Sequence, residues 1–119
     1  MKNIEIFEKT IQDGGNLQER GINATLYWAY RNTQDSGNDL INFDEVIWDN
    51  DIQPICNTLK ENNITEFTIS STFSSLIATL AQFDAQGFKM DGIVRVKSRH
   101  ANWSTGEREL IPAIKMVRA

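Results

Sequence analysis

The sequence predicts a single α+β domain spanning residues 1–119, with three or four helices packed on a small, mainly antiparallel sheet of three or four strands. Two observations carry this prediction. Apolar residues recur at helical intervals through most of the chain, and its C-terminal part contains two strand-like segments joined by a turn-rich stretch. The chain also lacks repeats, linkers and low-complexity tracts, and 119 residues suffice for one hydrophobic core.

The N-terminal part is predicted to be helical. Apolar residues are spaced as in a helix within residues 2–12, and the glycines at 14 and 15 end that segment. A second helix is expected over 17–34, with Asn16 able to cap it. Because Gly21 weakens a helix by about 1 kcal/mol relative to alanine, we expect the helix to start nearer Asn23.

A third helix is expected from the N-cap Asp51 to about Asn62. Pro54 falls in its first turn, where a missing N–H costs little. Asn63 can adopt the left-handed conformation that ends the helix, and Ile64 can supply the hydrophobic contact that follows. The stretch before this helix, residues 40–48, is ambiguous between a short strand and a helical lead-in.

Residues 66–76, EFTISSTFSSL, pass from a short strand over 67–70 into a fourth apolar helix that ends at Gly87. The hydroxyl cluster between them raises the question of a phosphate or nucleophile site. A phosphate loop needs glycines and a GK[ST] ending, and a nucleophile elbow needs G-x-S-x-G, and both are absent. We therefore expect Ser71 or Thr72 to cap the helix, and we assign no catalytic residue here.

Two strands, about 89–99 and 109–117, are predicted at the C-terminal end, and Pro112 places the second at an edge or at a bulge. Arg95, Lys97 and Arg99 alternate along the first strand and so share a face, while Val94 and Val96 face the core. Together with one residue before them and one on the partner strand they form a candidate RNA-binding row: Lys89, Arg95, Lys97, Arg99 and Lys115. The simpler interpretation is the solvated side of a half-buried sheet.

The net charge of −4 is unevenly distributed. Residues 1–64 hold 5 Lys and Arg against 11 Asp and Glu, whereas residues 65–119 hold 7 against 5. The acidic excess peaks in the acidic segment, residues 39–51, which has no basic residue and contains Asp39, Asp44, Glu45, Trp48, Asp49 and Asp51. This segment suits docking onto a basic protein surface, with Trp48 as an anchor if it is exposed; the plainer interpretation is solubility.

Other chemistry finds little support in the sequence. The one cysteine, Cys56, lies on an apolar helix face, and the one histidine, His100, has no neighbouring carboxylate. The usual Cys/His zinc sites are excluded, and the acidic segment lacks the spacing of a calcium loop. We predict no metal and no cofactor. Without a signal peptide or an apolar run of about 18 residues, we expect a cytoplasmic protein that does not enter the membrane.

Three stretches, LINFDEVIWDNDI, EFTISSTFSSLIATLAQFDAQGFKMDGI and STGERELIPAIKM, resemble a family of small uncharacterised proteins on mobile elements of Firmicutes. Some of its members look like type II-A anti-CRISPR proteins, which inhibit the Cas9 nuclease. The resemblance covers about residues 25–118 and leaves 1–20 outside. It brings no catalytic motif, and it implies Cas9 or the Cas9–guide RNA complex as a partner.

The leading functional hypothesis is a non-catalytic anti-CRISPR protein that binds Cas9 and interferes with guide-RNA loading or DNA binding. The acidic segment would act as a nucleic-acid mimic in a channel built for polyanions. One alternative is a protein that binds or cleaves guide RNA through the basic strand, with His100 as a possible participant. Another is an accessory module of a mobile element that binds a different protein. The sequence leaves the oligomeric state open.

Overall fold

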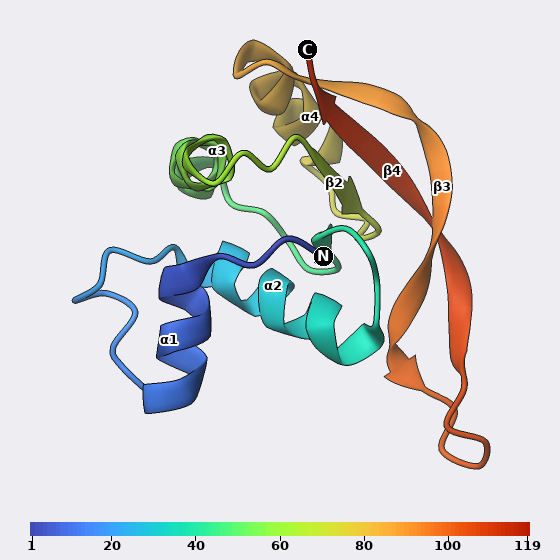
Figure 1. Ribbon diagram of the computed structural model, residues 1–119. Helices are drawn as coiled ribbons and strands as arrows, with labels where there is room; N and C mark the ends of the chain where they lie inside the picture. The colour runs from blue at the N-terminus through green and yellow to red at the C-terminus, as the bar shows by residue number, and fades with distance from the viewer.

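The computed structural model describes residues 1–119 and has four α-helices, one 3₁₀ turn and one four-stranded sheet (Figure 1). The predicted α+β class is confirmed. In chain order the elements are α1 (Glu5–Asp13), α2 (Ala24–Ser36), β1 (Asn42–Phe43), η1 (Asp49–Asp51), α3 (Ile52–Glu61), β2 (Glu66–Ile69), α4 (Leu76–Ala85), β3 (Phe88–Ala101) and β4 (Arg108–Arg118).

The sheet has the strand order β1-β2-β4-β3, with β1 parallel to β2 and the other pairs antiparallel. The long β3–β4 hairpin curves along one side of the molecule, and all four helices lie on its concave side (Figure 1). Pro112 lies in β4, which is a central strand in the sheet order. However, β2 pairs only with residues 114–117, so β4 has no neighbour on that side at Pro112 and loses no ladder bond there.

The hairpin is buried on different faces in its two halves. Met116 and Ala113 are both buried, yet they stand three residues apart and so point to opposite faces of β4. At one end Met116 pairs with Phe67 of β2; at the other, Ala113 pairs with Val94, next to the buried Val96. The Val96 orientation expected from the sequence is confirmed. The uncovered face of the second half leaves Ile93 and Leu110 exposed.

One hydrophobic cluster of 20 buried residues joins the helices to the sheet. Phe67 is central to it: its ring lies 5.5 Å from that of Phe43, 5.0 Å from Phe83 and 5.3 Å from Phe88. A second aromatic group connects α1 to α2, where the Phe7 ring meets Tyr30 edge-on at 5.3 Å. Such contacts add about 1 kcal/mol each beyond the area that they bury.

The prediction that α2 starts near Asn23 is confirmed. Asn23 is the N-cap residue, and the Asn23 Oδ1 accepts a hydrogen bond from the Leu26 N–H at 3.0 Å. Asn16 accepts from the Glu19 N–H at 2.9 Å, but it caps only an isolated turn and no helix follows. Gly21, with φ +67, explains the break between this turn and α2. Asn63 (φ 55) is left-handed as predicted, and Ile64 after it is buried.

One predicted helix cap is confirmed in position only, and the other is wrong. Asp51 is the N-cap residue of α3, as predicted, but its side chain makes no capping hydrogen bond to that helix. Helix α4 begins at Leu76 with Ser75 as its N-cap residue, so Ser71 and Thr72 lie too far before it to cap it. Ser71 Oγ donates to the Glu45 carbonyl at 2.9 Å, and Ser70 Oγ accepts from Asn42 Nδ2 at 2.9 Å. The hydroxyl cluster therefore fastens the end of β2 to β1 and the acidic segment.

Strand β3 forms an edge of the sheet, and three features blunt that edge. Asn38 binds the backbone of Lys97 twice: its Oδ1 accepts the Lys97 N–H at 2.8 Å, and its Nδ2 donates to the Lys97 carbonyl at 3.0 Å. The register shifts between Met90 and Ile93, where Gly92 has φ +86, and again beyond Lys97. A bulge and a side-chain clamp both oppose pairing with a foreign strand.

Candidate protein-docking site

The acidic segment does not form one continuous patch. Asp39 precedes β1 and lines a groove near the hairpin, whereas the other carboxylates follow β1 and lie toward α2, α3 and α4. Asp44, Glu45 and Trp48 line one pocket together. Thus the structure brings three of the six predicted residues together at one pocket, leaves Asp49 and Asp51 outside its lining, and separates Asp39 from the rest.

Two of the carboxylates bind an arginine of the predicted basic row. Arg99 Nη1 lies 2.7 Å from Glu45 Oε1, and its Nε lies 3.4 Å from Asp44 Oδ2. Hydrogen bonding to Glu45 is the main reason that the pKa of Arg99 is raised above its ordinary value. Asp44 is the more enclosed acid, with 16% of its side chain exposed against 63% for Glu45.

The other two carboxylates have only neutral partners. Asp49 Oδ1 accepts from Gln82 Nε2 of α4 at 2.9 Å. Asp51 accepts from Asn23 Nδ2 at 2.9 Å and from Thr25 Oγ1 at 2.8 Å, and so holds the start of α2 against η1. Asp51 is therefore a structural residue as well as a source of negative charge, because its two oxygens hold the start of α2 against η1.

The pocket lies between Trp28 of α2 and Trp48, and we call it the Trp28–Trp48 pocket. It has a volume of about 160 Å³ and is lined by Ala24, Thr25, Trp28, Ala29, Asn32, Phe43, Asp44, Glu45, Val46 and Trp48. Trp48 is 65% exposed and Trp28 is 49% exposed. Two exposed indoles at one small pocket with two carboxylates form the strongest candidate for a binding site in this chain.

Sequence reasoning gave Trp28 no role in a site. Its position in α2 contains the missing signal. The buried residues of α2 are Leu26, Tyr27, Ala29, Tyr30, Thr33 and Ser36. Trp28 falls off this stripe, so a helical projection alone places its indole toward solvent. The contact of Arg31 with the Trp28 ring, 5.6 Å from the centroid, also lies on that outer side of the helix.

The five residues of the predicted basic row do not act as one cationic face. Lys89 pairs with Asp84 at 2.9 Å, Arg99 binds the acidic segment, and Lys115 lies 3.3 Å from Glu66 and 3.9 Å from Asp91. Only Arg95 and Lys97 form no ion pair, and both are exposed.

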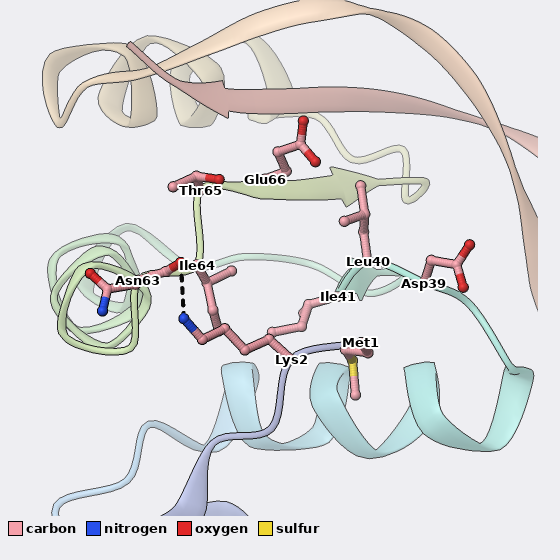
Figure 2. Close-up of a pocket in the computed structure, with 9 residues that line it drawn as sticks. All are labelled: Met1, Lys2, Asp39, Leu40, Ile41, Asn63, Ile64, Thr65 and Glu66. Carbon is pink, nitrogen blue, oxygen red and sulfur yellow. Dashed lines mark hydrogen bonds between the residues drawn. The ribbon is translucent and has the colours of Figure 1, made fainter.

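These two cations line a groove of about 430 Å³ on the hairpin, together with Asp39, Leu40, Glu66 and Lys115 among others. A smaller hollow of about 190 Å³ adjoins it, sharing Asp39, Leu40 and Glu66. Figure 2 shows this hollow between the N-terminal segment and the start of β2, with Lys2 Nζ donating to the Asn63 carbonyl at 3.5 Å. Both hollows mix acids and bases, so neither favours one charge of ligand.

The surroundings of Cys56 and of His100 differ, and neither suits a catalytic dyad. Cys56 is fully buried on α3, and burial raises the pKa of its thiol to about 11, whereas His100 is exposed on β3. A buried thiol held in its neutral form is a poor nucleophile. No group of three or more His, Cys, Asp or Glu side chains is placed to hold a metal ion. Nor does any helix have the length and apolarity needed to span a membrane.

Comparison with known proteins gives one match. A family model described as a domain of unknown function, DUF7698, matches residues 25–118, which include the acidic segment, the hairpin and every lining residue of the Trp28–Trp48 pocket except Ala24. Residues 1–24, with α1, lie outside the match. The searches of curated proteins and of solved structures found no match.

Proposed function

We propose that this chain, which belongs to the DUF7698 family, is a non-catalytic protein-binding module that docks onto a basic partner through its acidic segment. Trp48 is the anchor. The observation that carries the proposal is that Trp48 and Trp28, both exposed, line one pocket with Asp44 and Glu45. Exposed tryptophans are the side chains most enriched at the energetic centres of protein interfaces, and carboxylates around them select a cationic partner.

Cas9 is the partner that we propose, on the basis of the resemblance of three stretches to proteins that look like type II-A anti-CRISPR proteins. Cas9 holds its guide and target in positively charged channels. A protein with carboxylates around an aromatic anchor suits such a channel. Binding there would interfere with guide-RNA loading or with DNA binding, and it requires no catalysis by the inhibitor.

The test is DNA cleavage by Cas9 with the protein added before or after the guide RNA. We expect inhibition, and inhibition only on addition before the guide would identify guide loading as the blocked step. Co-purification with Cas9, with and without guide RNA, gives an independent readout. If neither assay responds under any order of addition, Cas9 is not the partner. A pull-down that recovers a different protein would instead support an accessory module of a mobile element.

Trp48→Ala is the key variant, and Trp103→Ala is its matched control. Trp103 is 97% exposed in the loop between β3 and β4 and makes no contact with the pocket. Removing an interface anchor costs about 2 kcal/mol or more, which is about thirtyfold in affinity. Loss of binding in both variants, or in neither, would contradict the role of Trp48.

RNA binding through Arg95 and Lys97 is the second candidate function. The observation that favours it is that these two exposed cations lack carboxylate partners and line the groove on the hairpin. Reversing both charges, Arg95→Glu with Lys97→Glu, should abolish binding to guide RNA if this function is correct. Unchanged RNA affinity in that variant would exclude it, and Trp48→Ala should leave RNA binding intact.

A further inference from the structure

We infer that the Trp28–Trp48 pocket is a receptor for a single arginine side chain presented by the partner. This inference rests on the proposed docking function and names the chemistry that the site recognises. The pocket's volume of about 160 Å³ falls below the roughly 300 Å³ at which protein pockets enclose a whole small molecule. One extended side chain is an occupant of suitable size.

The lining of the pocket combines what a guanidinium group requires. Its walls include Ala29, Phe43 and Val46, which favour a weakly hydrated cation over a strongly hydrated one. Indole rings attract cations over their faces, and guanidinium also stacks on them through its plane. The carboxylates of Asp44 and Glu45 supply acceptors for its N–H groups.

The chain's own arginines already use these groups. Arg31 lies over the Trp28 ring at 5.6 Å, and Arg99 binds Glu45 and Asp44. The aromatic and the acidic elements of the pocket thus each bind a guanidinium within the same molecule. None of the ten lining residues is Lys or Arg, so the pocket wall itself carries no positive charge.

The surrounding charge remains negative after these internal contacts. The two carboxylates of the pocket lining, Asp44 and Glu45, share the guanidinium of Arg99, and Arg31 adds a second positive charge over Trp28. Asp49 and Asp51 follow in the same segment, outside the lining, and their partners are neutral. The four carboxylates therefore exceed the two guanidinium groups by two charges. Lysine is the weaker ligand for this site because its ammonium is a strongly hydrated point charge that cannot engage two acceptors and a ring in one plane.

Peptide titration of the isotope-labelled protein tests the inference without Cas9. The probes are three acetylated Gly-Ser peptides of equal length that carry one central arginine, lysine or citrulline. The readout is the NMR shift of the indole N–H of Trp28, Trp48 and Trp103, assigned by Trp→Phe variants. We expect saturable shifts of Trp28 and Trp48 with the arginine peptide, weaker ones with lysine and none with citrulline, while Trp103 stays unmoved.

Glu45→Gln keeps the shape of an exposed side chain and should lower the affinity for the arginine peptide by about tenfold. An otherwise unchanged spectrum verifies that the variant is folded. Equal shifts with citrulline, a lysine peptide that binds as tightly as arginine, or shifts of Trp103 alone would each overturn the arginine site. These outcomes are independent of Cas9. If the protein binds Cas9 but shows no preference for the arginine peptide, the arginine site is refuted and the proposed partner stands. If it prefers the arginine peptide but does not bind Cas9, the proposed partner is refuted and the arginine site stands.

Discussion

Arg99 of β3 binds Glu45 of the acidic segment, with 2.7 Å between Nη1 and Oε1. The acidic segment and the basic row of β3, which the sequence offers as alternative binding sites, are therefore joined by an ion pair. The same arginine contacts Asp44 at 3.4 Å, so one cation of the hairpin offsets part of the negative charge at the Trp28–Trp48 pocket. The charge of the docking face is consequently adjustable by a single residue of β3.

Arg99→Gln should strengthen binding to a basic partner. The variant frees Asp44 and Glu45, and it makes the docking face more negative by one charge. We expect an increase of several-fold in association rate at low salt that fades as salt screens the charges. Because the Arg99–Glu45 pair lies at the surface, with 35% and 63% of the two side chains exposed, the free energy of unfolding should fall by only about 0.5 kcal/mol. Stopped-flow binding at two salt concentrations, with urea unfolding in parallel, measures both; slower association would contradict the role assigned to these carboxylates.

Asp51→Ala should destabilise the fold by about 2 kcal/mol, since it leaves the partly buried Asn23 and Thr25 without their charged acceptor. Asp49→Ala is the matched control, because it loses a single exposed contact with Gln82, and should cost about 0.5 kcal/mol or less. Urea unfolding of both variants makes the comparison. Charge reversal at Asp51 is thus a poor probe of docking, whereas charge reversal at Asp49 is a suitable one. Equal stability of the two variants would refute the structural role of Asp51.

The fold was largely predictable because its signals are local. Helical spacing located α1 and α3, Asn23 marked the start of α2, and β3 and β4 read as long alternating strands. The failed predictions share one cause. Ser71 and Asp51 were each expected to cap a helix through the side chain, yet the Ser71 hydroxyl binds the Glu45 carbonyl and the Asp51 carboxylate binds Thr25. Contacts between residues more than 20 positions apart have no local signature.

The candidate site was predictable only in part. The run of carboxylates around Trp48 is visible in the sequence, but the pairing of Arg99 with Glu45 spans 54 positions and depends on the curvature of the hairpin. Likewise, Trp28 joins Trp48 through the packing of α2 beside the acidic segment. The alternation of Arg95, Lys97 and Arg99 suggested one face, yet irregular register beyond Lys97 and ion pairing leave only two free cations.

Thr79→Val should leave the protein as stable or stabilise it by about 1 kcal/mol. The Thr79 hydroxyl is buried in α4 and is the one buried side-chain polar atom without a hydrogen-bond partner. Valine has nearly the same shape and removes the unsatisfied group. The matched control is Thr33→Val, where the hydroxyl donates to the Ala29 carbonyl and accepts the Asn42 N–H, each within 3 Å. That variant should lose about 2 kcal/mol. Thermal unfolding that ranks the two in the opposite order would refute the assignment.

Stability should fall as the pH rises above about 9. Burial raises the pKa of Cys56 from 9.0 to about 11, and burial together with the Glu8 contact raises that of Tyr30 from 10.0 to about 12. Because the folded pKa exceeds the unfolded one, each group's stabilisation is complete below the unfolded pKa and is lost by the folded one. Urea unfolding between pH 8 and pH 11 should show the decline. Cys56→Ala should be less stable at pH 8 but show a shallower decline with pH; an unchanged slope would exclude the thiol as a contributor.

Asn38→Ala should make the protein self-associate more strongly than the parent protein as its concentration rises. The variant uncovers the Lys97 N–H and carbonyl at the edge of β3, and an unpaired edge is a template for another strand. Loss of the two exposed hydrogen bonds should also cost about 1 kcal/mol. Asn3→Ala serves as control, since Asn3 is exposed and makes no side-chain hydrogen bond. Sedimentation velocity over a tenfold concentration range distinguishes the variants. If Asn38→Ala sediments as the parent protein does at every concentration, the bulge at Gly92 is by itself enough to protect the edge.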